Sequence, residues 1–204
     1  VETADGGFAV AGATESKGAG EYDVWVLKLD QTGALIWDRT FGGIATDWAS
    51  AIVETRDGGL AIGAYTQATP EQEFDFWVIK LDSTGELQWD RTFGAAAIDW
   101  ASAITELADG GIGVVGHTES KGAGGADMWV LKLDADGALL WDRTFGGSER
   151  DYAATVGATQ DGGLVVAGPT ESYGAGLVDI RVLKLDAQGD VMWDHIFGGA
   201  DSDW

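Results

Sequence analysis

Apolar and polar residues alternate along this chain in short runs, and most runs end at a turn that contains glycine. The clearest stretch, residues 23–43, reads DVWVLKLDQTGALIWDRTFGG: an apolar run, a K-L-D-x-x-G turn and a second alternating run. Runs of four to eight residues rich in Val, Ile, Trp and Thr, bounded by Gly and Asp, are typical of β-strands. No stretch has the 3.6-residue periodicity of an amphipathic helix. The pattern therefore predicts an almost entirely β protein.

The same stretch occurs four times at a constant interval of 52 residues, without insertion or deletion. A fixed period of this length indicates a repeat architecture, because one such unit cannot bury its apolar face without stacking on a neighbour. We therefore predict one domain of four units. The units are residues 1–48, 49–100, 101–152 and 153–204.

Each unit contains four predicted strands, A to D in chain order. In the second unit they are residues 49–55, 60–66, 75–82 and 86–93. The Asp-Gly-Gly sequence between A and B predicts a tight hairpin, for which we expect a primed turn with glycine at positive φ. Strand C is apolar on both faces apart from one lysine, so we expect it to be covered on both sides. Its lysines are Lys28, Lys80, Lys132 and Lys184.

Four antiparallel strands in about 50 residues are typical of a β-propeller blade. Strand A, rich in Ala and Ser, is expected at the axis, and strand D at the outer edge. The two tight turns of each blade, A–B and C–D, then lie at one end of the disc. The variable B–C loops and the D–A crossovers lie at the other end. Variable loops gathered on one face predict that ligands bind there.

Three sequence marks recur in every unit: Gly-Gly or its equivalent before an acidic–aromatic pair, Asp-Gly before an apolar strand, and K-L-D-x-x-G before a Trp-containing strand. With these marks the whole chain resembles the bacterial and archaeal β-propeller repeat family of secreted and surface proteins. The resemblance implies a propeller fold and an extracellular or cell-surface location. It implies no catalytic residues, because the family shares none.

The chain carries 34 acidic and 12 basic residues, for a net charge of −22, and it contains no cysteine. Nucleic acids and anionic membrane surfaces attract basic proteins, so we expect neither as a partner. No apolar run approaches the ~18 residues of a membrane span, so membrane insertion is not expected. The acidic surface is either simply solvated or an adaptation to high salt, in which the salt screens carboxylate repulsion.

Acidic–aromatic pairs at the D–A crossovers are the best candidates for a repeated binding site. Each aspartate has two interpretations: it caps the turn through backbone N–H groups, or it helps to coordinate Ca²⁺. The aromatic residues either pack between blades or form a ligand platform. Apart from Ca²⁺, no cofactor is expected. The pairs are Asp47 and Trp48, Asp99 and Trp100, Asp151 and Tyr152, and Asp203 and Trp204.

Two further tryptophan columns recur, and we expect both to pack between blades. One lies in strand C, where the fourth unit has arginine instead, and the other lies in strand D. Their members are Trp25, Trp77, Trp129 and Arg181 in strand C, and Trp37, Trp89, Trp141 and Trp193 in strand D.

No local motif assembles a catalytic set, and both histidines, His117 and His195, are single substitutions in the repeat. Active sites in repeat proteins usually break the symmetry with an inserted loop, and here the loops have equal lengths. We therefore predict a non-enzymatic extracellular structural or adhesive module, within a larger surface assembly or filament. The alternative is a propeller that binds a glycan or Ca²⁺ on its loop face, and a propeller enzyme is less favoured. Expected partners are further copies, other surface proteins or glycans.

The chain ends carry two parts of a single strand A. Val1–Thr3 match its end and Asp203–Trp204 its start, which leaves the four positions of residues 49–52 empty. We expect the ends to meet and close a four-bladed ring. In the alternatives, one molecule completes the next, giving a larger ring or a filament, or the chain is part of a longer propeller, in keeping with its abrupt start at Val1.

Overall fold

The computed structural model describes residues 1–69 and 72–203, and all of its strands belong to four antiparallel sheets. The first sheet has the order β1 (Phe8–Thr14), β2 (Asp23–Leu29), β3 (Leu35–Phe41). The second contains β4 (Asp47–Glu54), β5 (Leu60–Thr66), β6 (Asp75–Leu81) and β7 (Leu87–Phe93). The third contains β8 (Asp99–Glu106), β9 (Ile112–Thr118), β10 (Asp127–Leu133) and β11 (Leu139–Phe145). The fourth contains β12 (Thr155–Ala158), β13 (Leu164–Thr170), β14 (Asp179–Leu185) and β15 (Val191–Phe197).

Each sheet is one repeat unit folded as a propeller-like blade, as the sequence predicted. Strands β4 and β8 begin at Asp47 and Asp99, two residues earlier than expected. Strand β12 is shorter than its predicted range of 153–159, because the Ala153 N–H donates to Gly116 O of the preceding sheet instead. Among the described residues, no helix is long and apolar enough to cross a membrane.

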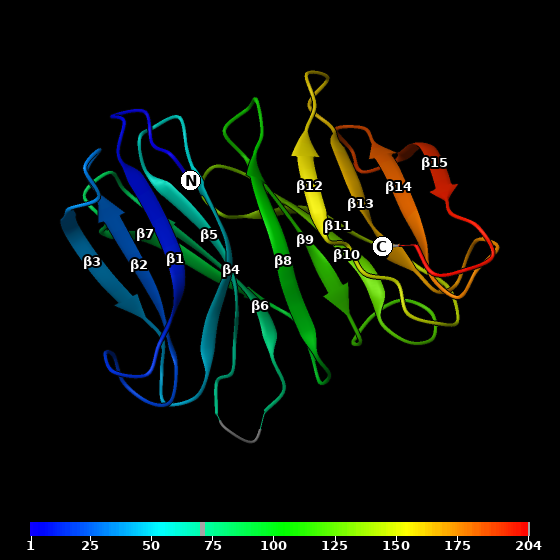
Figure 1. Ribbon diagram of the computed structural model, residues 1–204, viewed down its shortest axis with the longest axis horizontal. Coiled ribbons are helices and arrows are strands. Elements are labelled where there is room, and N and C mark those ends of the chain that lie inside the picture. The colour runs from blue at the N-terminus through cyan, green and yellow to red at the C-terminus, as the bar shows by residue number, and fades with distance from the viewer. Residues whose placement is uncertain (70–71, 204) are drawn as a thin grey trace.

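The four sheets follow one another in a row, with β1, β4, β8 and β12 side by side along its middle (Figure 1). These inner strands touch directly: the Ser50 hydroxyl in β4 donates to the Ala101 carbonyl in β8 at 2.6 Å. Strands β3, β7, β11 and β15 form the outer edges, which confirms the predicted place of strand D. The apolar core lies between adjacent sheets, where Phe76 and Val78 meet Trp129 and Leu131.

The closed four-bladed ring that we expected is not the arrangement of this structure. The first sheet has only three strands, and the short segment before β1 contributes a single bridge, from Glu2 to Phe8. At the other end, Asp203 stays with its own blade, its N–H donating to Val178 O at 2.8 Å. The first and fourth sheets lie at opposite ends of the row (Figure 1). The split strand therefore stays a prediction, now between two molecules.

The A–B hairpins are not primed turns, so that prediction was wrong. In the second unit the Gly58 N–H donates to Thr55 O at 2.8 Å and the Thr55 N–H to Gly59 O at 2.9 Å. Gly58 has φ +77°, whereas Asp57 does not have a positive φ. This is a type I turn closed by a left-handed glycine. In this conformation the Asp57 carboxylate accepts the Gly59 N–H at 3.0 Å and the Thr55 hydroxyl at 2.6 Å.

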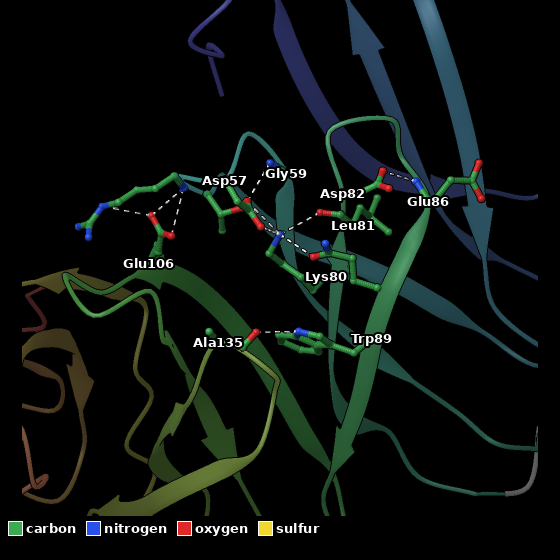
Figure 2. Close-up of polar contacts among 12 residues, drawn as sticks. Asp57, Gly59, Lys80, Leu81, Asp82, Glu86, Trp89, Glu106 and Ala135 are labelled. Atoms are coloured by element: carbon green, nitrogen blue, oxygen red, sulfur yellow. Dashed lines mark hydrogen bonds and ion pairs between the residues drawn. The ribbon is translucent and has the colours of Figure 1, made fainter.

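The lysine of strand C is buried and neutralised by the aspartate of the A–B turn. Lys80 is 5% exposed, and its Nζ lies 2.9 Å from Asp57 Oδ2, 3.0 Å from Leu81 O and 3.1 Å from Gln88 Oε1 (Figure 2). The contact ties strand C to the turn at the end of its sheet. The other three pairs are Lys28 with Asp5, Lys132 with Asp109 and Lys184 with Asp161.

The strand-C tryptophans donate their indole N–H groups to the aspartate of strand D, and Trp129 also buries its ring. Trp129 is 1% exposed, packs on Phe76 of the preceding blade at 4.7 Å between centroids, and donates to Asp142 Oδ2 at 3.0 Å. Arg181, the exception, makes the same connection: its Nε and Nη2 donate to Asp194 at 3.2 and 2.7 Å. The substitution thus keeps the link to strand D.

In the first and third units a lysine also lies over the strand-C ring, and in the fourth unit ring and cation have changed places. Lys121 Nζ in the B–C loop lies 4.7 Å from the Trp129 ring centroid. In the fourth unit the ring is Tyr173 in the loop, and the Arg181 guanidinium in the strand lies 4.6 Å from it. The two positions therefore form a coupled pair.

We expect Tyr173→Lys alone to place two cations together and to lower the free energy of unfolding by about 1–2 kcal/mol. Adding Arg181→Trp restores the arrangement of the third unit, so the double variant should regain most of the loss. Urea denaturation of the single variants and the double variant measures this coupling. Strictly additive effects would contradict it.

Candidate functional site

Each D–A crossover anchors its aspartate against the B–C loop of the same blade. The Asp47 N–H donates to Tyr22 O at 2.7 Å, and Asp99, Asp151 and Asp203 make the equivalent bond. The first three of these side chains are buried, and Asp203 is half-buried. The four predicted crossover aspartates thus occupy one repeated position at this end of the blades.

Sequence reasoning missed a second aspartate that faces each of them, the first residue of strand C. Asp127 and Asp151 both point at Gly146 in the crossover: a β-carbon there would collide with Asp127 Oδ1 and lie 2.9 Å from Asp151 Oδ2. Only glycine leaves room for both carboxylates. The signal was visible, since strand C begins with aspartate in every unit. The pairs are Asp23 and Asp47, Asp75 and Asp99, Asp127 and Asp151, and Asp179 and Asp203.

The crossover aspartates do cap the turn, as one of the two interpretations predicted. Asp151 Oδ2 accepts the Gly147 N–H at 2.9 Å and the Ser172 hydroxyl at 2.6 Å, and its Oδ1 accepts the Thr170 hydroxyl. Asp47 likewise accepts the Gly43 N–H at 2.8 Å. These bonds fix the loop but satisfy only part of the carboxylate pair.

The paired carboxylates oppose one another's ionisation. Burial raises the pKa of Asp127, and the charge of Asp151 raises it further, against one hydrogen bond from the Ala123 N–H. Burial also raises the pKa of Asp75, with Asp99 as the second cause. Within residues 1–69 and 72–203, no group of three or more His, Cys, Asp or Glu side chains is placed to hold a metal ion. Each candidate site therefore consists of two aspartates, one from strand C and one from the D–A crossover.

The aromatic members of the predicted site lie in a row that crosses the blades. Trp48 lies 5.4 Å from Tyr22, and Trp100 lies 4.0 Å from Tyr65, between ring centroids. His117 continues the row, 6.2 Å from Trp100 and 4.7 Å from Tyr152. Trp48 is 40% exposed, whereas Trp100 and Tyr152 are half-buried. The remaining predicted member, Trp204, lies outside the described residues.

Burial shifts the pKa values of two side chains in this row, His117 and Tyr65. It lowers the pKa of His117 to about 4, against a small opposing effect of Asp99, so the imidazole is neutral at physiological pH. It raises the pKa of the Tyr65 hydroxyl to about 12. His117 is therefore an aromatic spacer in the row rather than a cationic group.

The two outer faces of the row of blades are apolar and open. In the first blade Phe8 and Val10 are 40% and 43% exposed, whereas Leu60 and Ile62 at the same positions of the second blade are 3% and 0% exposed. In the fourth blade Trp193 and Phe197 are 40% and 57% exposed. These faces lack the neighbouring blade that covers the inner ones.

The strand-D tryptophans show what each blade face contacts. A β-carbon on Gly85 would lie 2.9 Å from Trp37 Cζ3, so the indole of one blade lies against the C–D turn of the next. Trp89 against Gly137 and Trp141 against Gly189 repeat this contact, and their indole N–H groups donate to the turn at Ala135 O and Ala187 O. Trp193 faces no such turn within residues 1–69 and 72–203, and Gly33, the matching glycine of the first blade, has no described atom near the position of a β-carbon.

A hollow at the opposite end of the blades is lined by charged side chains that are already paired with one another. It lies between the second and third sheets and is lined by Thr55, Asp57, Lys80 and Glu106 among others. Its charged groups are already paired: Glu106 accepts the backbone N–H of Arg56 at 3.1 Å, and Lys80 binds Asp57. The repeated carboxylate pairs and the open blade faces remain the candidate functional features.

These features define an all-β repeat protein of propeller-like blades with acidic crossovers. No protein-family model matches the chain. The chain has distant homology to the regulatory protein FlaEY of Caulobacter vibrioides, with 28% identity over 209 residues, covering 88% of this chain and 22% of that protein. The chain thus spans about a fifth of the length of that relative.

Two solved structures share a low similarity with the chain. A crystal structure titled as the eukaryotic initiation factor has 10% identity and a TM-score of 0.48, covering 97% of this chain and 54% of the other. Sqt1 of Chaetomium thermophilum, bound to the N-terminus of the ribosomal protein L10, has 12% identity and a TM-score of 0.36, covering 94% and 61%. The fold assignment rests on the four sheets themselves.

Proposed function

We propose that the chain is a non-enzymatic structural or adhesive β-propeller module that associates, blade face to blade face, with a further copy of itself. The observation that carries this proposal is an unfilled contact at each end of the row. Among the described residues, Trp193 has no glycine turn against it, and Gly33 has no indole against it. Inner blades make this contact three times with nearly constant geometry. The outward face of the fourth blade therefore carries the indole that would fit against the C–D turn on the outward face of the first blade.

The chain ends supply a second match between the same two faces. In the inner blades the crossover aspartate holds a threonine of strand B, as Asp47 holds Thr66 and Asp151 holds Thr170. Asp203 is held in the equivalent place at the end of the fourth blade by its bond to Val178 O. In the first blade the strand-B threonine at the position of Thr66 is Thr14. Its hydroxyl is hydrogen-bonded to Ser16 and not to a crossover aspartate. A second copy docked on the first blade would bring Asp203 to Thr14.

The open face of the fourth blade is apolar at more than one position. Trp193 and Phe197 lie on the same side of β15, and they are 40% and 57% exposed. Contiguous exposed apolar surface of this kind marks protein–protein contacts.

The extracellular or surface location is part of the proposal and rests on the family resemblance of the repeats. In the distant relative FlaEY the matched region is a small share of a long protein. Equal loop lengths in all four units support the non-catalytic role, since no unit carries an added loop.

Sedimentation equilibrium over a range of protein concentrations tests the association. The unmodified chain should form species larger than a monomer, and Trp193→Ser should raise the dissociation constant at least about tenfold, as expected for a central tryptophan. Ile36→Gln is the matched control: Ile36 is 55% exposed, and glutamine occurs at the same position of the second unit as Gln88. Equal weakening by both variants, or a monomer at every concentration, would contradict the proposal.

Gly33 supplies the reciprocal test. Gly33→Ala should weaken association, because the new methyl group occupies the place of the incoming indole. Gly6→Ala carries the same backbone strain, since Gly6 has φ +80° and Gly33 has φ +83°, but Gly6 lies in the other hairpin with open space around it. Only the first variant should change the dissociation constant.

A second candidate function, glycan binding, is favoured by the aromatic row. Exposed aromatic rings stack on the apolar faces of sugars, and Trp48 and Tyr22 present such rings on the loop face. Glycan-array binding that is lost in Trp48→Ala and retained in Trp193→Ser would support it over association.

A further inference from the structure

One oxygen of the strand-C aspartate lacks a partner although it is buried. Asp179 is 1% exposed, and its Oδ2 accepts the Gly176 N–H at 3.0 Å, whereas its Oδ1 has no hydrogen-bond partner among the described residues. The Oδ1 atom of Asp75 is in the same state. A buried carboxylate oxygen that has lost its water and gained no donor is unstable.

The unpartnered oxygen points at the second carboxylate of its pair. A β-carbon on Gly198 would collide with Asp179 Oδ1 and lie 2.9 Å from Asp203 Oδ2, so both oxygens face one point above this glycine. The same geometry recurs at Gly42, Gly94 and Gly146. The facing geometry occurs in all four pairs. Two of them, Asp75 with Asp99 and Asp179 with Asp203, contain a buried carboxylate oxygen that has no hydrogen-bond partner among the described residues, which indicates a built feature rather than a local defect.

No basic side chain neutralises these pairs within the described part of the chain. The nearby loop lysines are committed elsewhere: Lys17 binds Asp38, and Lys121 binds Asp142. Two buried like charges therefore face one another in a protein of net charge −22. A bound cation would satisfy the free oxygen and cancel the repulsion in one step.

We propose that each carboxylate pair binds one Ca²⁺ ion. The donors are oxygens only, which hard cations prefer, and carbonyls of the flanking loops with water complete the six to eight ligands that Ca²⁺ takes. This places the strand-C aspartates Asp23, Asp75, Asp127 and Asp179 in the site beside the crossover aspartates.

Two of the sites are reachable from solvent. A hollow beside Asp47 is lined by Gly42, Gly43, Thr66 and Trp77 among others. A second hollow touches Asp75, between the B–C loop and the crossover residues Ala95 and Ala96. An ion can enter along these openings without rearrangement of the sheets.

Isothermal titration of chelator-treated protein with CaCl₂ tests the proposal, with MgCl₂ as the comparison at fixed NaCl. We expect up to four Ca²⁺ ions per chain and a rise in Tm at millimolar Ca²⁺ that Mg²⁺ does not match. Mg²⁺ demands a stricter octahedral geometry and gives up its water reluctantly. No heat of binding and no shift in Tm up to about 10 mM Ca²⁺ would overturn the proposal.

Asp127→Asn separates a cation ligand from a purely structural cap. Asparagine keeps the acceptor for the Ala123 N–H, which Asp127 Oδ2 accepts at 2.8 Å, and removes the repulsion with Asp151. The variant should therefore match or exceed the unmodified chain in Tm without Ca²⁺, while its capacity falls by one ion per chain. Asp136→Asn, an exposed aspartate of the C–D turn, makes the same charge change away from the pair.

Each result decides the matter. One ion lost in Asp127→Asn and none in Asp136→Asn supports the site. An unchanged Ca²⁺ capacity in Asp127→Asn would place the ions elsewhere and overturn the assignment. A Tm that falls equally with and without Ca²⁺ would show that Asp127 only caps the loop.

Discussion

Trp129→Ala should lower the free energy of unfolding by about 3–5 kcal/mol, the range measured for truncation of a buried tryptophan. The indole is 1% exposed and fills the seam between the second and third blades, against Phe76 at 4.7 Å. Its loss leaves a cavity between two sheets that cannot close over it, and Asp142 loses the indole N–H donor. Urea denaturation followed by tryptophan fluorescence and circular dichroism measures the change.

Trp25→Ala is the matched control for this prediction. Trp25 has the same neighbours within its own blade: Lys17 over the ring at 4.8 Å and Asp38 accepting the indole N–H at 2.9 Å. It lies in the first blade, and it is half-buried. We expect a loss of roughly 1–2 kcal/mol in the monomer. Equal losses for the two variants would show that the seam between blades contributes nothing.

Asp57→Ala should lower the free energy of unfolding by about 2 kcal/mol. The substitution leaves the Lys80 ammonium, 5% exposed, without its counter-charge, and it removes the two bonds that Asp57 accepts from the turn. Breaking a fully buried ion pair costs about 3–5 kcal/mol, and water at the half-exposed Asp57 carboxylate reduces that cost.

The double variant Asp57→Ala with Lys80→Met separates charge from turn geometry. It removes the unpaired ammonium while it keeps most of the apolar stem, so it should recover part of the loss measured by urea denaturation. If the double variant is no more stable than Asp57→Ala alone, the loss comes from the turn bonds and not from the buried charge.

The same pair predicts a loss of stability in acid. Partial burial raises the pKa of Asp57, but hydrogen bonds from Thr55 and Lys80 outweigh it and lower the pKa from 3.8 to about 2. The folded state then binds its proton less readily than the unfolded state, so this stability is complete above pH about 4. It is lost as the pH falls toward 2. Asp57→Asn should flatten that part of the profile of Tm against pH.

The turn residues show what local sequence predicts well and where it stops. Asp-Gly located every A–B hairpin, because only glycine readily takes the positive φ that the chain needs there. The turn type was wrong, since the Asp57 carboxylate binds Thr55 and Gly59 and holds a right-handed conformation at the aspartate. Such a side-chain contact with the backbone is local, yet a dipeptide pattern does not distinguish it from a primed turn.

The sequence predicted one of the two aspartates in each candidate site. The crossover aspartates were identified from their place beside an aromatic residue, and their turn-capping bonds agree with one of the two interpretations. Their partners at the start of strand C were not identified, because the sequence separates Asp127 from Asp151 by a hairpin and a crossover. Only the folded blade brings both carboxylates to Gly146.

The sequence by itself determined the repeat, the number of units, the β character and most strand bounds. These follow from period-two alternation and from glycine positions, which act over a few residues and recur in each copy. The tertiary structure alone decided that Lys80 neutralises Asp57. It also decided that, in the part of the chain that the structure describes, Trp193 and Gly33 lack partners and the row of blades is open. Each of these depends on contacts between strands or blades, and identical local patterns are buried or exposed according to whether a neighbouring blade covers them.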